Sequence, residues 1–346
     1  MAKLTIETII DVIRQNGPVS SGELNLLLKD KAGYATIKRR LTELVEKDLV
    51  SLQGSRKSTK YFISAANDIN APINTKDYFK LEIDQRKIKK NYQFDLTESI
   101  LPNHSLFKKT EIDHLNQLQN KYLKNIKELS HTELNKELER LAVDLSWKSS
   151  QIEGNTYSLL ETERLLKEKI TAEGKTHEEA VMLLNHKDAL DFIVEYPDYV
   201  SPLTVKSIED IHKLLTKDLG IDQNIRKRRV GISGTNYEPL VGEFQIKEAL
   251  QDICLTVNHK DNVFEKSFIT LIMLSYLQAF ADGNKRTARI TSNAVLINHN
   301  YCPLSFRTVD SIEYKKAMLI FYEQNNISPF KEIFIDQYQF AVETYF

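Results

Sequence analysis

The sequence predicts a mainly α-helical protein with a small separate domain at its N-terminus. Two observations predict the helical class. Glycine and proline are scarce, at 11 and 8 of 346 residues, and apolar residues recur at helical spacing over long stretches. A third observation sets the N-terminal region apart, because two short β-like runs, 49–52 and 61–63, flank a polar, basic turn. A chain of this length is long enough for two or three domains.

The sequence pattern of residues 1–65 predicts three helices followed by a hairpin. Isoleucines repeat at helical spacing between residues 6 and 13, and a Gly-Pro pair ends that helix. Ser20 and Glu23 have the spacing of a capping box for a second helix. A third helix is expected from about 36 to 47, before the two β-like runs. This order of elements resembles a winged helix-turn-helix domain.

The charge of this region favours a nucleic-acid interpretation. Residues 1–65 contain 11 Lys and Arg against 7 Asp and Glu, an excess of four positive charges, whereas the whole chain has a net charge of −1. The winged-helix resemblance implies that the third helix enters the major groove of duplex DNA and that the hairpin tip contacts the backbone. A protein-interaction surface is the alternative. The residues expected to contact DNA are Lys38, Arg39, Arg40, Arg56 and Lys57.

Residues 66–109 are expected to form a linker and a connecting segment, and residues 110–346 a helical domain. The stretch from 65 to 75 is small and polar with one proline, which is typical of a linker. The rest of the connecting segment is irregular and aromatic-rich, so we expect it to pack over the helical core. Helical periodicity then returns and is broken at 225–240, where β-branched residues flank two glycines and predict a hairpin.

The most informative segment, at 280–289, reads Phe-Ala-Asp-Gly-Asn-Lys-Arg-Thr-Ala-Arg. Apolar helical patterns precede and follow it, so the Gly-Asn turn lies where a helix begins. Backbone amides at such a turn can form a concave site for phosphate oxygens, aided by the helix dipole. Arg286 and Arg289 share one helix face and can each bind phosphate through two nitrogens, while Asp282 can hold a divalent metal. The candidate phosphate-binding residues are Gly283, Asn284, Lys285, Arg286 and Arg289.

This segment resembles the signature of the Fic (Fido) family, His-x-Phe-x-Asp/Glu-Gly-Asn-Gly/Lys-Arg-x-x-Arg. Seven positions match in register, but Gln278 stands where the family has its catalytic histidine. The resemblance implies a Fic-fold helical core with a β-hairpin flap, and transfer of AMP from ATP to a protein hydroxyl with Asp282 holding Mg²⁺. Glutamine cannot accept a proton near pH 7, and losing a general base typically costs ~10²–10⁴-fold in rate. The sequence therefore predicts a complete nucleotide site with an impaired transferase.

Two further segments resemble parts of the same family. Residues 149–155, Ser-Ser-Gln-Ile-Glu-Gly-Asn, resemble its inhibitory motif, Ser/Thr-x-x-x-Glu-Gly/Asn, through Ser149 and Glu153. The resemblance implies that Glu153 pairs with Arg289 and keeps this arginine from a terminal phosphate. The alternative is a surface salt bridge at a helix end. The hairpin expected at 225–240 lies where the family has its flap, which aligns a protein target by strand addition. The flap residues are Ile232, Ser233, Gly234 and Thr235.

The sequence leaves several functions open. The chain is interpreted first as a nucleotide-binding regulator that is linked to DNA through its N-terminal domain. It is alternatively a hydrolase that removes AMP, in which Glu153 orients a metal-bound water, or an AMP transferase that uses another base. A fourth interpretation takes Gln278 as an engineered substitution in an active transferase, and a protein-interaction scaffold is a further alternative.

The bulk composition excludes some other classes. A net charge of −1 gives no global attraction for nucleic acid, and no apolar run approaches the ~20 residues of a membrane span. Cys254 and Cys302 lack metal-ligand spacing, which fits a reducing compartment. The first residues lack the pattern of a signal peptide, so a cytoplasmic location is expected. The oligomeric state is left open.

Overall fold

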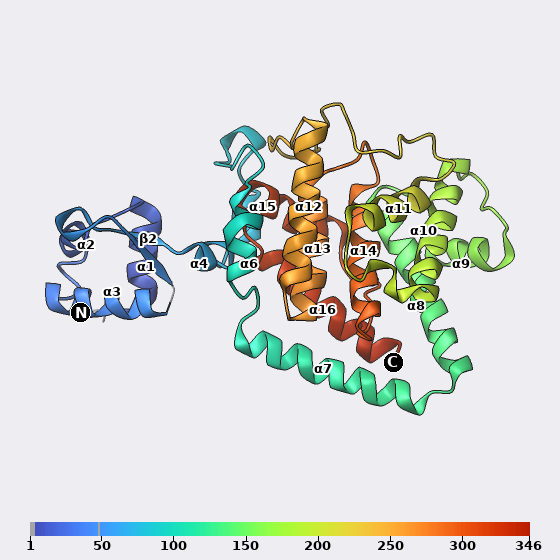
Figure 1. Cartoon of the computed structure of the whole chain (residues 1–346), viewed down its shortest axis with the longest axis horizontal. Coiled ribbons are helices and arrows are strands. Elements are labelled where there is room, and N and C mark those ends of the chain that lie inside the picture. Colours follow the sequence, from blue (N-terminus) through green and yellow to red (C-terminus); the bar gives the residue numbers. More distant parts are fainter. Residues whose placement is uncertain (1–3, 48) are drawn as a thin grey trace. The chain divides into compact units, whose positions relative to one another are not determined.

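A computed structural model describes residues 4–47 and 49–346, and the side chain of Lys57 lies outside this description. The chain divides into two compact units, the first ending at Pro72 and the second comprising Ile73–Phe346. Helices dominate, which confirms the predicted mainly α class (Figure 1). None of the helices in the described ranges combines the length and apolarity that a bilayer crossing requires.

The first unit has three helices and then a two-stranded antiparallel hairpin, the order expected from the sequence. Its elements are α1 Ile6–Asn16, α2 Ser21–Leu27, α3 Tyr34–Glu46, β1 Val50–Gln53, a 3₁₀ turn Arg56–Ser58, β2 Lys60–Ile63 and α4 Ala65–Ile69. The helices share one apolar core, in which Ile9, Leu24 and Leu41 are fully buried. The hairpin turn requires glycine, because Gly54 has φ 91° and a Cβ there would lie 2.5 Å from the carbonyl oxygen of Ser58.

The boundary of the first unit lies further along the chain than residue 65. Ser64 caps α4 by accepting a hydrogen bond from the amide of Asn67, and the Asn67 side chain donates to the carbonyl of Leu49 at 3.2 Å. Ile69 is buried. These contacts tie the start of the expected linker to the hairpin, so the linker composition at 65–75 does not mark an extended chain throughout.

The second unit begins with short elements and continues as a set of longer helices. The short elements are α5 Thr75–Tyr78, a 3₁₀ turn Ile83–Gln85, a π-turn Leu96–Ile100 and α6 Leu101–Asn103. The longer helices are α7 Lys109–Glu128, α8 His131–Ile152, α9 Leu159–Glu168, α10 His177–Glu195, α11 Val205–Thr216, α12 Glu243–His259, α13 Val263–Leu277, α14 Asn284–Asn298, α15 Ser311–Gln324 and α16 Ser328–Thr344. A 3₁₀ turn, Pro197–Val200, follows α10.

Helix α13 is the centre of the second unit. It is apolar on all sides and nearly all of its residues are buried, which is the pattern of a core helix. α12 and α14 pack against it (Figure 1). α13 ends at Leu277 and is followed by Gln278, which has a left-handed backbone with φ 52°, and α14 begins after Gly283, with φ 78°. The signature segment is therefore a short turn between two buried helices.

A buried ion pair holds the connecting segment against α15. The guanidinium of Arg86 lies 3.1 Å from the carboxylate of Glu323, and these side chains are only 3% and 1% exposed. The hydroxyl of Tyr78 donates to the same carboxylate at 2.6 Å. A second nitrogen of Arg86 donates to the carbonyl of Gly234 at 2.8 Å. Arg86 and Tyr78 thus anchor the connecting segment to the second unit, although residues 80–85 between them are exposed.

The hairpin expected at 225–240 is not formed. Within the described ranges, β1 and β2 form the only sheet, and the segment carries a single parallel bridge, between Asn91 and Glu238. Arginine side chains take the backbone oxygens that strand pairing needs. Arg226 is buried and donates to the carbonyls of Arg228 and Leu240, at 3.0 and 2.5 Å. The two ends of the segment are therefore joined through one guanidinium, and the bridge at Glu238 is its one strand-like backbone pairing in the described structure.

Candidate functional site

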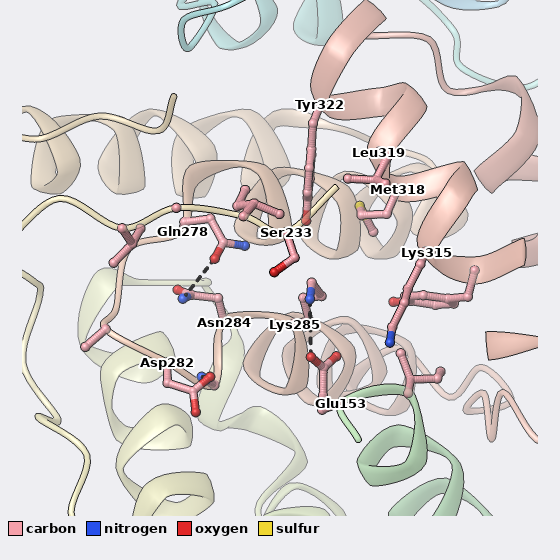
Figure 2. Close-up of a pocket in the computed structure, with 17 residues that line it drawn as sticks. Glu153, Ser233, Gln278, Asp282, Asn284, Lys285, Lys315, Met318, Leu319 and Tyr322 are labelled. Atoms are coloured by element: carbon pink, nitrogen blue, oxygen red, sulfur yellow. Dashed lines mark hydrogen bonds and ion pairs between the residues drawn. The ribbon is translucent and has the colours of Figure 1, made fainter. Parts of the chain in front are cut away.

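A cavity of 380 Å³ lies where the signature turn meets three other parts of the second unit. The signature turn supplies Gln278 and residues 281–285, the end of α8 supplies Ile152 and Glu153, and residues 230–233 cover one side. α15 supplies the wall opposite. Figure 2 shows Gln278 and Asn284 at one end of this cavity and Lys315 at the other, with Lys285 and Glu153 between them.

Asn284 fixes the shape of the signature turn. Its side-chain oxygen accepts a hydrogen bond from the amide of Phe280 at 2.8 Å, and its nitrogen donates to the carbonyl of Phe280 at 2.8 Å. The same nitrogen donates to the side-chain oxygen of Gln278 at 3.3 Å (Figure 2). Asn284 is buried, so these bonds are protected from water. A residue predicted to bind phosphate through its backbone therefore also closes the loop with its side chain.

Gly283 is required by the packing of α11 against the turn. Its φ is 78°, and a Cβ would lie 3.1 Å from the methyl group of Thr216 and 3.4 Å from Nε2 of His212. His212 donates from Nε2 to the carbonyl of Asp282 at 2.9 Å, and its ring stacks on Phe280 with centroids 3.7 Å apart. Burial lowers the pKa of His212, which favours the neutral ring. Sequence reasoning missed this role, because a lone histidine on a helix carries no signal.

The amide of Gly283 is not free to bind a ligand. It donates to Oδ1 of Asp282 at 2.6 Å, so the expected two-amide phosphate nest is partly occupied by the protein's own carboxylate. Oδ2 of Asp282 lies 3.5 Å from a guanidinium nitrogen of Arg286, and the aspartate side chain is 68% exposed. Asp282 is thus a carboxylate that lines the cavity and is open to solvent.

Arg286 and Arg289 are buried and do not line the cavity. Arg286 donates to the carbonyl of Leu215 at 3.4 Å. Arg289 donates from Nε to the hydroxyl of Ser149 at 2.7 Å and from Nη2 to the carbonyl of Ser149 at 3.0 Å. The guanidinium also lies 5.4 Å from the ring centre of Tyr314. Both arginines are therefore positioned by neighbouring helices.

Glu153 closes the face of the cavity in front of Arg289. Its carboxylate lies 2.9 Å from Nη2 of Arg289 and 3.2 Å from Nζ of Lys285. Burial raises the pKa of Glu153, but Arg289 and Lys285 together outweigh burial, so the net pKa is below its ordinary value. The pair expected between Glu153 and Arg289 is present, and it is not a surface salt bridge, because the arginine side chain is 0% exposed.

Gln278 is held at the end of the cavity formed by the signature turn. Its side-chain nitrogen donates to the carbonyl of Ser275 at 2.6 Å, and its side-chain oxygen accepts from Asn284. Its backbone carbonyl accepts from Nε of Arg226 at 2.5 Å. Arg226 is the first of four consecutive basic residues, and the structure buries it while Lys227, Arg228 and Arg229 are exposed. Only the first of these four side chains therefore supports the cavity from inside the protein.

Part of the region around this cavity is similar to a known protein family. Residues 202–296, which include the signature turn, match the Fic/DOC family. The second unit therefore contains a region similar to the Fic/DOC family, and the cavity is called the Fic cavity below. Protein adenylyltransferase Fic of Drosophila virilis is 23% identical over 203 residues, which are 58% of this chain and 41% of that protein. The protein of the same name from Nematostella vectensis is 27% identical over 172 residues, 49% and 40% of the two chains. The matched region is thus less than half of either relative.

Solved structures share the fold at low sequence identity. Fic-1 from C. elegans matches with a TM-score of 0.57 and 22% identity, covering 68% of this chain and 72% of that chain. A Fic domain containing signaling protein from Bacteroides thetaiotaomicron matches with a TM-score of 0.57 and 19% identity, covering 66% and 94%. The likeness extends well beyond the 95 residues of the family match, so most of the second unit belongs to the same fold.

Helix α15 lies outside the signature segment but forms one wall of the cavity. Its contacts with the cavity fall in two rows at a spacing of four residues, as expected for one face of a helix. The first row is Tyr314, Met318 and Tyr322, and the second is Lys315 and Leu319. The spacing is visible in the sequence, but it is also the spacing of an ordinary core helix, so only the structure distinguishes a wall from a core face.

Of the flap residues, Ile232 and Ser233 line the Fic cavity and Gly234 and Thr235 do not. Figure 2 shows the Ser233 hydroxyl directed toward the middle of the cavity. The carbonyl of Gly234 is taken by Arg86, and the hydroxyl of Thr235 accepts from the amide of Tyr237 at 3.0 Å. The segment therefore covers the cavity with its first half and is anchored by its second half.

The expected DNA-binding residues differ in their solvent exposure and in their ion pairs. Lys38, Arg39 and Arg56 are exposed, and the amine of Lys38 lies 4.8 Å from the ring centre of Tyr34. Arg40 is half-buried and bonded to Glu43 at 2.6 Å, so it is committed to its own helix. Lys57 is outside the description of side chains. The face of α3 thus presents two exposed basic residues where the sequence suggested three.

Proposed function

We propose that this protein binds a nucleotide in the cavity of its Fic domain, that Glu153 closes the cavity, and that AMP transfer is weak because Gln278 cannot accept a proton. The observation that carries the proposal is the ion pair between Glu153 and Arg289, which links the inhibitory segment to the signature helix at 2.9 Å. By family resemblance the nucleotide is ATP, and a protein target would approach at residues 232–235.

The residues fit a nucleotide once Glu153 moves away. A cavity of 380 Å³ lies within the range of ordinary ligand pockets. The two cations beside it, Lys285 and Arg289, both contact Glu153, and the ionised carboxylate repels phosphate while it is in place. Displacing one side chain would remove the carboxylate partner of both cations. Glu153 is the C-terminal capping residue of α8 and is followed by Gly154, which has φ 105°. Glu153 therefore lies where the helix ends and the chain changes direction, not inside the helix.

The site also offers one carboxylate, that of Asp282, as a ligand for Mg²⁺. Mg²⁺ in nucleotide sites is usually bound by one or two carboxylates together with the substrate phosphates. Asp282 lines the cavity and its side chain is 68% exposed. Across residues 4–47 and 49–346, no group of three or more His, Cys, Asp or Glu is placed to hold a metal, so the protein would supply this single carboxylate. When bound, the ion would neutralise phosphate charge.

Gln278 determines the expected activity. Its amide donates to Ser275 and accepts from Asn284, so both functional ends are used for structure. A neutral amide gives no general base for deprotonating a target hydroxyl, and the loss is worth ~10²–10⁴-fold in rate. The site therefore supports nucleotide binding more strongly than it supports chemistry, and a regulatory role follows.

A hydrolase that removes AMP is the second candidate. The observation that favours it is that Glu153 lines the same cavity as Asp282, where Arg289 and Lys285 hold the pKa of Glu153 below its ordinary value. A carboxylate in that position can orient an attacking water, and this reaction needs no base at Gln278. Incubation of an AMP-modified protein with the natural chain would release AMP if this candidate is correct. Release should then disappear in Glu153→Gly.

We infer that the first unit binds duplex DNA through α3 and the hairpin tip. The support is the exposure of Lys38, Arg39 and Arg56 on a unit with a positive charge excess. In the full chain, Lys38→Ala and Arg39→Ala should each weaken duplex binding and reduce the salt slope by about one. Lys47→Ala is the matched control, because Lys47 is already paired with Glu43 at 2.7 Å. No binding at low salt would leave a protein-interaction role.

Calorimetry with ATP and Mg²⁺ tests the main proposal. Glu153→Gly should bind more than about tenfold more tightly than the natural chain, because Arg289 and Lys285 become available. Glu173→Gly is the matched control, since Glu173 is exposed in a turn before α10. A folded Glu153→Gly protein that binds no nucleotide would contradict the proposal.

A further inference from the structure

Lys315 differs from every other cation at the Fic cavity. Arg289 and Lys285 are both engaged by Glu153, and Arg286 is directed to the carbonyl of Leu215 and to Asp282. Lys315 lines the cavity and is exposed. Among the described side chains it has no carboxylate within ion-pairing distance, whereas its neighbour Lys316 is bonded to Glu313 at 2.9 Å. Lys315 is thus an unneutralised positive charge at a concave site.

The position of Lys315 is set by α15. It follows Tyr314, which faces the guanidinium of Arg289, and it precedes Leu319 by one helical turn on the cavity wall. In Figure 2 its amine points from the helix toward the side of the cavity where Glu153 and Lys285 meet. The signature turn, with Asn284 and Gln278, is at the other end. The end of the cavity away from the signature turn therefore carries one cation, Lys315, that is not part of the signature.

We propose that Lys315 binds the terminal phosphate of a nucleoside triphosphate and makes the site selective for triphosphates over monophosphates. This inference rests on the proposed nucleotide-binding function. A phosphate at the signature turn lies at the opposite end of the cavity from Lys315, so a monophosphate reaches one end only. A triphosphate chain extends past the position that Glu153 now occupies and brings its last phosphate to Lys315. An ammonium group is a strong partner for phosphate oxygens.

The proposal also explains how a ligand can compete with Glu153. The carboxylate neutralises Arg289 and Lys285 but leaves Lys315 available, so the closed cavity still attracts an anion. A terminal phosphate that first binds Lys315 lies next to the Glu153 carboxylate and repels it. Ligands that lack this phosphate lack this effect. The gate would then respond to the length of the phosphate chain as well as to ligand concentration.

Calorimetry on the full-length Glu153→Gly protein tests the proposal, with ATP, ADP and AMP as probes in the presence of Mg²⁺. Adding Lys315→Met should weaken ATP binding by roughly tenfold and change AMP binding by less than about twofold. Lys316→Met is the matched control and should change neither. Lys315→Arg should restore most of the ATP affinity, which separates loss of charge from loss of folding.

Competition by inorganic tripolyphosphate provides a second measurement. Tripolyphosphate should displace ATP from Glu153→Gly and do so several-fold less well after Lys315→Met. Equal weakening of ATP and AMP by Lys315→Met, or no weakening of either, would overturn the assignment of Lys315 while leaving nucleotide binding intact. A Glu153→Gly protein that binds none of the three nucleotides would overturn both this assignment and the proposed function.

Discussion

Two parts of the Fic cavity are held by different kinds of interaction. In its middle, the Glu153 carboxylate is held by two cations, Arg289 and Lys285. At the end formed by the signature turn, Gln278 is held by neutral hydrogen bonds to Ser275 and Asn284 (Figure 2). The Glu153 carboxylate can be replaced by another anion, such as a ligand phosphate. A conformational change cannot supply the proton acceptor that Gln278 lacks. Binding in this site is therefore controlled by conformation, and chemistry by the identity of one side chain.

The largest expected effect comes from restoring the proton acceptor. In a Glu153→Gly background, Gln278→His should increase labelling from α-labelled ATP by about 100-fold or more, because it adds the missing general base. Self-modification measured by autoradiography provides the readout. The Glu153→Gly protein without the histidine is the control. Strong labelling by that control would show that Gln278 does not limit the reaction and would remove the contrast between Glu153 and Gln278.

The signature turn should be sensitive to a single methyl group. Gly283→Ala places a Cβ at φ 78°, 3.1 Å from Thr216, and should lower the free energy of unfolding by about 1–3 kcal/mol. Urea denaturation of the full chain measures this. Gly242→Ala is the control, because its φ is −79° and its nearest neighbour is the flexible Gln245 side chain. Similar losses in the two variants would argue against a strained turn.

A smaller effect is expected at the support of the gate. Ser149→Ala removes the acceptor of Arg289 Nε and should cost about 1–2 kcal/mol, because it leaves part of a buried guanidinium unpaired. Ser150→Ala is a closely matched control, since the Ser150 hydroxyl is buried and has no hydrogen-bond partner in the described structure. Equal denaturant midpoints for the two variants would mean that Ser149 does not hold Arg289.

The smallest effect is expected from pH. The net pKa of Glu153 lies below its ordinary value of 4.5. The stability gained from its ion pairs is therefore present above the unfolded pKa and is lost only as pH falls through the folded pKa. Between about pH 6 and 8 the gate stays charged. The ratio of ATP affinities of the natural chain and Glu153→Gln should change by less than about twofold over this range. A ratio that approaches one at pH 6 would mean that the carboxylate is already being protonated.

The sequence predicted the motif residues well and their surroundings poorly. The helical class, the signature turn between two helices and the pairing of Glu153 with Arg289 could be predicted, because each depends on local spacing or on a short motif. The hairpin expected at 225–240 was wrong, because local patterns do not show which side chains bind the backbone of that segment. Its backbone oxygens are taken by Arg226 and Arg86, which are buried arginines that look like surface charges in a sequence. His212 and the wall of α15 were missed for the same reason, since long-range contacts assign their roles.

The buried pair between Arg86 and Glu323 determines how short an autonomous fragment of this protein can be. A truncated chain that starts at residue 110, where regular helical periodicity begins, would discard Arg86 and Tyr78 and leave the Glu323 carboxylate without its cation inside the protein. Breaking a buried pair in this way costs about 3–5 kcal/mol, which is a large share of the stability of a typical domain. Recombinant versions intended for crystallisation should therefore start at Ile73.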